Sequence, residues 1–205
     1  MANTTVPYSE AAVASMAASL LDEYNIVSLD EDTPLARFMS REFGFVRDEV
    51  LQIYPWHVAG KRVSLSPLAN EPEFGWKYAY QLPSDCIRVR PLRDGGLLDT
   101  AELPHEIEGG QILTDQPAPL YVRYTYRLTN MSKWRPMMAR LLACRLAMYA
   151  ATRITGKSMY YEKCVQEYNR AFFEATHADS LERGSTERVQ LYDNSHDAIS
   201  VRGIT

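Results

Sequence analysis

The chain has 205 residues, which is enough for one domain or for a domain with a long arm. Hydrophobic residues make up 46% and charged residues 23%, a soluble composition that excludes wholesale disorder. The net charge is −4, whereas proteins that grip nucleic acid through its phosphates carry a basic excess, so a DNA-gripping module is not expected.

The first predicted helix begins after Ser9, a strong N-cap residue. Its apolar residues recur at helical spacing and predict one buried stripe: Val13, Met16, Ala17, Leu20, Leu21 and Tyr24. Asn25 is expected to end this helix, because asparagine tolerates the left-handed conformation.

A second helix is predicted to begin at Thr33, with Pro34 in the first turn, and to end before Pro55. Its apolar positions keep the helical period: Leu35, Phe38, Met39, Val46, Val50 and Ile53. Gly44 in its interior indicates a kink or a close packing contact.

Residues 60–127 show a different pattern, in which Pro, Gly and Asp separate short segments rich in Val, Ile and Tyr. Strands are predicted at 62–66, 86–91, 105–108, 112–114 and 120–127, with turns at 94–96 and 109–110. This part of the chain is expected to form a small antiparallel sheet.

Two long helices are predicted next. One spans 136–155, is apolar on most sides and ends at Gly156. Ser158 is expected to cap the other, whose inward stripe is Tyr161, Cys164, Val165, Tyr168, Phe172 and Ala175.

The last segment, residues 182–205, is polar and mixed in charge. A chain of this kind does not order itself alone, and its isolated apolar side chains favour an arm that folds onto a partner over a frayed terminus. The expected contact residues are Arg188, Val189, Leu191, Tyr192, Ile199 and Val201.

The predicted fold class is therefore α+β, mainly α: a bundle of about four helices with an inserted small antiparallel β domain and an extended C-terminal arm. The expected division is 1–57 and 131–181 for the bundle, 58–130 for the β domain and 182–205 for the arm.

Catalytic and metal-binding patterns are weak. The segment 155–158 (TGKS) lacks the preceding glycine of a phosphate-binding loop, and Ser195-His196-Asp197 are three neighbours in a polar tail rather than a convergent triad. The four histidines show no metal-ligand spacing. We therefore expect no catalytic residue, no cofactor and no metal, and the chain is not expected to be an enzyme.

For three groups of residues, a structural or solvent-exposed role is expected in place of a role in catalysis or ligand binding. Cys86, Cys144 and Cys164 are odd in number and are expected to be buried free thiols made in a reducing compartment. The carboxylates Glu102, Glu106 and Glu108 indicate a solvated face rather than a catalytic pair. Arg140, Arg145 and Arg153 are expected to pair with carboxylates or to face a neighbouring subunit, rather than to bind an anion.

Neither a signal peptide nor a membrane span is predicted. The N-terminal residues do not combine a basic start with an apolar stretch. The longest apolar run, within 141–151, is interrupted by Arg145 and is too short to cross a bilayer.

One ordered set of segments stands out: 24–31, 46–56, 58–65 and 76–89. Its most specific parts are Pro55-Trp56 after a helix and the Tyr-x-Leu-Pro-x-Asp-Cys motif that contains Leu82, Pro83 and Asp85. In this order the segments resemble the tail tubular protein A family of short-tailed phages and related head-to-tail adaptors. Relatives often carry Ile-Gly where this chain has Tyr24-Asn25.

The resemblance implies a structural virion protein that forms a dodecameric ring with itself between the portal protein and the next tail component, a nozzle or stopper. The ring extends the DNA channel, and DNA passes through it without sequence-specific binding. The expected location is the neck of the virion, after assembly in the bacterial host cytoplasm, with no membrane partner. A stopper or head-completion protein is the alternative.

Overall fold

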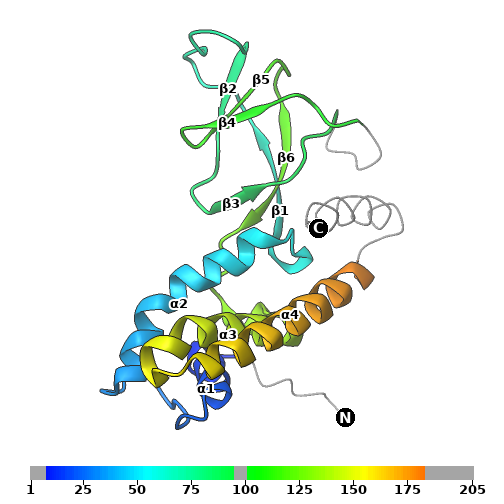
Figure 1. Cartoon of the computed structure of the whole chain (residues 1–205). Helices are drawn as coiled ribbons and strands as arrows, with labels where there is room; N and C mark the ends of the chain where they lie inside the picture. The colour runs from blue at the N-terminus through cyan, green and yellow to red at the C-terminus, as the bar shows by residue number, and fades with distance from the viewer. Residues whose placement is uncertain (1–7, 95–100, 183–205) are drawn as a thin grey trace, which may run out of the picture. The chain divides into compact units, whose positions relative to one another are not determined.

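The computed structural model describes residues 8–94 and 101–182, which divide into two compact units (Figure 1). The helical unit comprises the chain up to Ala59 and Tyr126–Ala178, and the β unit comprises Gly60–Thr125 together with the last described residues, 179–182. The predicted α+β fold, mainly helical with an inserted β-rich part, is confirmed. The chain enters the β unit at Gly60, close to the predicted 58, and leaves it at Thr125, a few residues before the predicted 130.

Helix α1 spans Glu10–Leu20, and the Ser9 side chain accepts a hydrogen bond from the Ala12 backbone N–H at 3.1 Å, as its cap position predicts. Two expectations about its end were wrong. The left-handed residue is Asp22, with φ 56°, and not Asn25. Tyr24 lies beyond the helix and is 93% exposed, because the chain turns away before the helical period reaches it.

Helix α2 spans Pro34–Ile53 and begins as predicted, with the Thr33 hydroxyl accepting from the Ala36 N–H at 3.1 Å. It ends at Tyr54, whose extended backbone suits the residue before a proline. The kink or close packing contact expected at Gly44 is not present. The helix is continuous there, and a Cβ atom on this residue would make only an ordinary contact with the end of the Arg47 side chain, at 3.9 Å. Ile53, in the last turn, is exposed rather than part of the buried stripe.

Helix α3 spans Pro136–Ala150, continues as one π-helical segment, Ala151–Thr155, and ends at Gly156 with φ 66°. Both α1 and α2 pack against it. Its buried side chains occupy successive positions and therefore all sides of the helix: Met138, Ala139, Leu141, Leu142, Ala143, Cys144, Leu146, Ala147 and Ala150. The predicted central helix is confirmed.

Helix α4 spans Ser158–Leu181, so Ser158 is its first residue and not the cap that was predicted. Cys164 and Ala175 of the predicted stripe are buried, and Ala171 is buried with them. Tyr161 was wrongly assigned to this stripe, because it is 43% exposed one turn from the helix start.

The β unit contains two three-stranded sheets and not the single sheet that was predicted. The strands are β1 Gly60–Leu65, β2 Tyr78–Gln81, β3 Cys86–Val89, β4 Glu106–Glu108, β5 Gln111–Thr114 and β6 Leu120–Tyr126. Their order is β1-β6-β3 in one sheet and β2-β5-β4 in the other. Strand β2 was not predicted.

The turn at Gly109 and Gly110 was predicted and is present, with φ 56° and 78°. These two residues join β4 to β5 directly, because Glu108 pairs with Gln111, and a two-residue hairpin turn of this kind requires positive φ at both positions. Across the hairpin, Ile107 faces Ile112.

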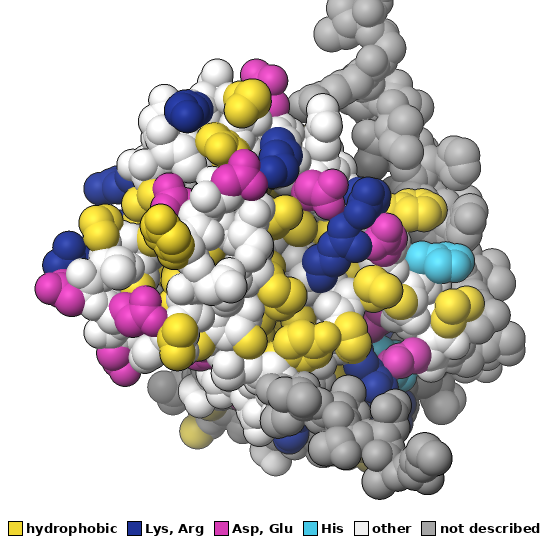
Figure 2. Space-filling view, turned by 90° about the horizontal axis from the view of Figure 1, so that it is seen from below, with side chains coloured by type: hydrophobic (Ala, Val, Ile, Leu, Met, Phe, Trp, Pro, Cys, Tyr) yellow, Lys and Arg dark blue, Asp and Glu magenta, His cyan; other side chains and the backbone are white. Residues whose placement is uncertain are grey.

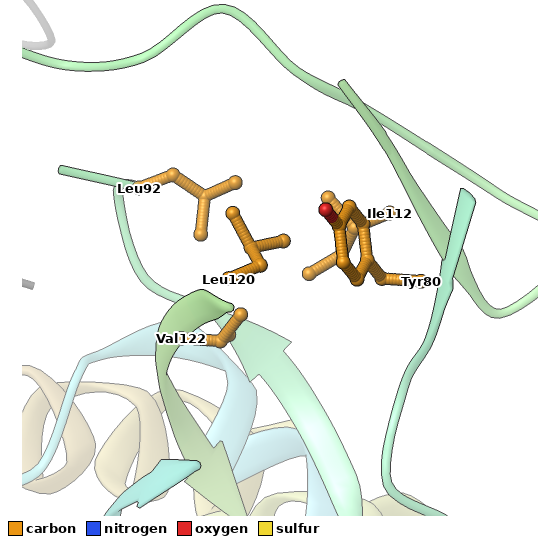
Figure 3. Close-up of a cluster of buried hydrophobic side chains, with 5 residues drawn as sticks. All are labelled: Tyr80, Leu92, Ile112, Leu120 and Val122. Carbon is orange, nitrogen blue, oxygen red and sulfur yellow. The ribbon is translucent and has the colours of Figure 1, made fainter. Parts of the chain in front are cut away.

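Both sheets bury side chains in one shared core (Figure 3). Tyr80 and Ile112 come from β2 and β5, Leu120 and Val122 come from β6, and Leu92 comes from the segment after β3. Since side chains alternate along a strand, the positions between these residues point away from the core on the outer face of each sheet.

Candidate interaction surfaces

The Pro55-Trp56 motif closes the end of α2. Trp56 is 1% exposed, and its indole Nε1 donates to the backbone oxygen of Val50 at 2.6 Å. Its ring lies 4.7 Å from that of Tyr54 between centroids. Val50 belongs to the last turn of α2, where carbonyls lack helical partners, so Trp56 acts as a side-chain cap. The motif is structural and fixes where the chain leaves the helical unit.

Asp85, from the second motif, connects strands β1 and β6 next to the start of β3. Its Oδ1 accepts from the Tyr124 hydroxyl at 3.0 Å, and its Oδ2 accepts from Lys61 Nζ at 2.5 Å. Lys61 and Tyr124 are directly paired across the two strands. Since Cys86 begins β3, the carboxylate holds three strands of one sheet together.

The electrostatics of this cluster follow from the same contacts. The hydrogen bond from Lys61 lowers the pKa of the Asp85 carboxyl, against the opposing effect of its partial burial. Burial and the hydrogen bond to Asp85 raise the pKa of Tyr124 to about 12. At neutral pH the Asp85 carboxylate therefore accepts a charge-assisted hydrogen bond from a protonated Tyr124 phenol.

Leu82 and Pro83 carry the chain from one sheet of the β unit to the other. The Leu82 N–H donates to the Gly110 oxygen at 3.0 Å, and its side chain packs against the shared core. The Pro83 oxygen accepts from the Cys86 N–H at 2.9 Å, which closes a turn before β3. The motif therefore shapes the β unit.

The loop between α1 and α2 presents two apolar side chains on a fixed backbone. One oxygen of the Glu31 carboxylate accepts from the N–H groups of Val27 and Ser28, at 2.7 and 2.9 Å. Yet Val27 is 85% exposed and Tyr24 is 93% exposed. A loop held in this way exposes apolar surface without the freedom to fold it inward.

A polar cluster lies where α2, α3 and α4 meet. Arg145 Nε donates to Glu49 at 3.2 Å, and the Tyr149 hydroxyl donates to the same carboxylate at 2.9 Å. The guanidinium carbon lies 5.1 Å from the ring centroid of Tyr149 and 5.4 Å from that of Tyr168. A pocket of about 150 Å³ opens beside it.

The expectation for the helical arginines can now be judged one by one. Arg145 pairs with a carboxylate, and Arg140 joins α3 to α4 through Glu167 at 3.0 Å and Glu174 at 3.2 Å. Arg153 is exposed near the end of the π-helical segment. The first two therefore serve the packing of the bundle.

The surface of the helical unit carries hydrophobic side chains among charges of both signs (Figure 2). Phe173 on α4 is 72% exposed and stacks on His177 with ring centroids 6.3 Å apart. Phe45 on α2 is also exposed. Aromatic side chains are enriched at the cores of protein contacts, so this surface has the chemistry of an interface.

A groove of about 770 Å³ crosses the outer face of the β2-β5-β4 sheet. Its floor is formed by Ala79 and Leu113, and the loop that carries Phe74 and Trp76 forms one wall. The carboxylates around it are Glu71, Glu73, Glu106 and Glu108. The Trp76 indole donates to Glu106 at 3.2 Å and so ties the loop to β4.

Sequence reasoning did not identify this groove, although it noted the clustered glutamates. Glu106 and Glu108 share one face of β4 and are exposed, as predicted for a solvated face, and Glu102 lies elsewhere in the unit at an isolated bridge with Arg93. Two aromatic residues close together in one segment, Phe74 and Trp76, were the available signal, but only the pairing of β2 with β5 brings that loop over the sheet.

Several predicted residues lie outside the described part of the chain. They are the arm contacts Arg188, Val189, Leu191, Tyr192, Ile199 and Val201, together with Ser195-His196-Asp197. Within residues 8–94 and 101–182, no three His, Cys, Asp or Glu side chains are grouped to hold a metal ion. None of the helices in those ranges has the length and hydropathy to span a bilayer.

The sequence matches no protein-family model and no curated protein sequence. Arguments about function therefore start from the fold, the two motifs and the surfaces described above.

Proposed function

We propose that the chain is a structural protein of a tailed-phage virion, a head-to-tail adaptor that forms a dodecameric ring between the portal and the next tail component. The ordered segments around Pro55-Trp56 and Leu82-Pro83-Ser84-Asp85 motivate this proposal through their resemblance to such adaptors. The helical unit with an inserted β unit agrees with the build that the resemblance implies.

The observation that carries the proposal is the exposure of large apolar side chains on rigid supports. Tyr24 and Val27 stand on a loop fixed by Glu31, and Phe74 and Phe173 expose 87% and 72% of their surface. Single exposed apolar residues are ordinary, but large apolar side chains exposed on both units favour a subunit with more than one neighbour. A ring subunit has a neighbour on each side and a component above and below it.

The charge of the chain suits a conduit for DNA. With a net charge of −4, the ring offers phosphates few cations to pair with, so DNA slides through without lasting contacts. Under this proposal the protein works by binding other chains in the neck of the virion, after assembly in the bacterial host cytoplasm, and it is not an enzyme.

Among the described residues, the groove beside β4 is the feature that favours an enzymatic alternative, since Glu106 and Glu108 lie on the same face of that strand. Glu106 and Glu108 are exposed on an open sheet face. A general acid or base is usually shielded from water by its surroundings, so we prefer a contact surface. A stopper or head-completion protein remains the structural alternative, and it differs in its partner, because a stopper binds the adaptor and not the portal.

The deciding experiment mixes the purified chain with its cognate portal and images the product by electron microscopy. A ring stacked on the portal supports the adaptor. A monomer that ignores the portal overturns the proposal, and binding only to a preformed portal–adaptor complex identifies a stopper.

A second experiment removes residues 184–205. This segment is polar and mixed in charge, so we expect unchanged folding and weaker portal docking when it is removed. Docking at wild-type strength by this truncated chain would show that the proposed arm residues play no part.

A further inference from the structure

The groove on the β2-β5-β4 sheet combines an apolar floor with an acidic rim. Ala79 and Leu113 are nearly buried at its base, while the wall carries Trp76 and the strongly exposed Phe74. The rim glutamates number four, and no Lys or Arg is found among the described residues that line it. Its occupant is therefore expected to combine positive charge with apolar surface.

The other sheet of the β unit carries a surface of that chemistry. Val63 and Val122 pair across β1 and β6 and face the shared core, so the flanking positions face outward. Arg62 and Arg123 are directly paired at these outward positions. We call the surface formed by Arg62, Arg88, Tyr121 and Arg123 the arginine face.

The remaining members of the arginine face follow from the same alternation. Val89 packs against the core, so Arg88, one position before it on β3, points outward and is exposed. Tyr121 on β6 is 48% exposed beside Arg123. Each strand of this sheet thus contributes an outward arginine.

The groove and the arginine face point in opposite directions. Both sheets direct their apolar side chains into the core formed by Tyr80, Ile112, Leu120 and Val122, so their outer faces lie on opposite sides of the β unit (Figure 3). A head-to-tail ring requires this arrangement, because each subunit must offer one surface to the subunit before it and a different surface to the one after it.

We propose that the arginine face of one subunit docks into the acidic groove of the next copy of the chain. This contact rests on the proposed ring and names the surfaces that close it. The Cα atoms of Arg62 and Arg123 lie roughly 5 Å apart across the strands, and those of Glu106 and Glu108 lie roughly 7 Å apart along one strand, so the spacing of the two arginines suits two carboxylates. Trp76 offers a ring face on which a guanidinium group stacks.

Charge reversal tests the contact through two variants of the full chain. The groove variant is Glu73→Lys with Glu108→Lys, which leaves the Trp76 to Glu106 hydrogen bond in place. The face variant is Arg62→Glu with Arg88→Glu, at two exposed positions. Ring formation is measured by mass photometry and negative-stain microscopy, with and without the portal.

Each variant alone is expected to need at least roughly tenfold more protein for half-assembly, because like charges then meet at every contact of the ring. An equimolar mixture of the two is expected to assemble like the wild type when the variants alternate around the ring. At one contact the lysines of the groove variant meet the glutamates of the face variant. At the next contact the unchanged acidic groove of the face variant meets the unchanged arginine face of the groove variant. Misfolded variants would not rescue each other, so this recovery identifies the contact.

The matched control is Glu102→Lys with Glu162→Lys, two exposed carboxylates outside the groove, which is expected to assemble like the wild type. Milder neutral changes, Glu73→Gln with Glu108→Gln, guard against loss of folding. They are expected to weaken assembly and to reduce its dependence on salt concentration.

The outcomes separate this inference from the proposed function. If the wild type forms the ring on the portal but both charge-reversed variants also form it at wild-type concentration, the contact is wrong while the adaptor proposal stands. Impaired variants that fail to recover on mixing also contradict the contact. If the wild type forms no ring under any condition, the proposed function falls and the contact falls with it.

Discussion

The Tyr124 hydroxyl donates to Oδ1 of Asp85 at 3.0 Å while Lys61, the cross-strand partner of Tyr124, donates to the other oxygen of the same carboxylate. One side chain from the loop before β3 thereby fixes the spacing of β1 and β6. In the proposed contact these two strands carry Arg62 and Arg123, one position along from Lys61 and Tyr124. The motif residue therefore supports the arginine face from behind.

Asp85→Asn is expected to lower the free energy of unfolding by about 1 kcal/mol, because one strand-bridging charge is lost. The figure is modest since the side chains of Asp85 and Lys61 are 35% and 45% exposed. The pKa of Asp85 is lowered in the folded protein, so its stabilisation is present above the unfolded value near ~3.9 and is lost as the pH falls through the folded value. Urea unfolding of both proteins at several pH values measures this.

The control for that change is Asp32→Asn, which removes an ion pair with Arg37 whose side chains are 90% and 63% exposed. We expect almost no change in unfolding free energy there. Equal losses at the two positions would mean that Asp85 holds nothing beyond an ordinary surface pair.

Tyr124 predicts a loss of stability at alkaline pH. Its pKa is raised to about 12 in the folded protein, so the folded state keeps the proton that the unfolded chain releases above the ordinary tyrosine pKa of 10.0. This stabilisation is complete below pH 10 and falls by up to ~1.4 kcal/mol per pH unit above it. Unfolding of wild type and Tyr124→Phe, compared between pH 9 and 11, should show a steeper fall for the wild type, and parallel curves would contradict the prediction.

Trp56→Phe is expected to lower the free energy of unfolding by about 1–3 kcal/mol, since a buried ring becomes smaller and the Val50 oxygen loses its indole donor. Trp76→Phe provides the matched comparison, because Trp76 is only partly buried and donates to an exposed carboxylate. Chemical denaturation should rank the two variants clearly. A smaller loss at Trp56 than at Trp76 would refute its capping role.

A double-mutant cycle on Glu49 and Arg145 is expected to give a coupling energy of about 1–2 kcal/mol, because the pair is partly buried and Arg145 also lies against two aromatic rings. Glu49→Gln, Arg145→Met and the double variant supply the cycle. The exposed pair of Asp32 and Arg37 should couple by less than about 0.5 kcal/mol. Similar coupling energies for both pairs would show that the Glu49–Arg145 pair stabilises the fold no more than an ordinary surface pair does.

The thiols are expected to react in a fixed order with a maleimide reagent under native conditions. The expectation that all three thiols are buried was wrong for Cys86, which is partly exposed at the start of β3, whereas Cys144 and Cys164 are buried as predicted. Burial raises the pKa of Cys144 to about 11. Cys86 should be labelled first, with the other two reacting only on unfolding, as read by mass spectrometry. Early labelling of Cys144 would show that the helical unit opens readily.

The helices were predictable from local chemistry because their ends are encoded by neighbouring residues. Ser9 and Thr33 cap through their own hydroxyl groups, and Gly156 ends α3 through a left-handed backbone that glycine adopts without strain. The turn at Gly109 and Gly110 was predictable for the same reason, because two adjacent glycines adopt the positive φ angles that this turn requires.

Features that depend on pairing between distant parts of the chain were not predictable from the sequence. Strand β2 is only four residues long, and its pairing with β5 joins positions that are thirty or more residues apart. Helical periodicity placed Tyr24 and Tyr161 in buried stripes, but a stripe continues only while the helix does and while another element covers it. The groove and the arginine face require the registers of two sheets, which no local pattern encodes.

The stretch Gly60–Thr125 is inserted between the helices and carries the strands of the β unit. Its first and last residues are paired across the adjacent strands β1 and β6. Its entry and exit are therefore only about 5 Å apart, a gap that a short turn can bridge. An insertion whose two ends lie this close together can change in length or be replaced without moving the helices on either side of it. Such an architecture lets the inserted β unit change during evolution while the helices that carry it stay the same.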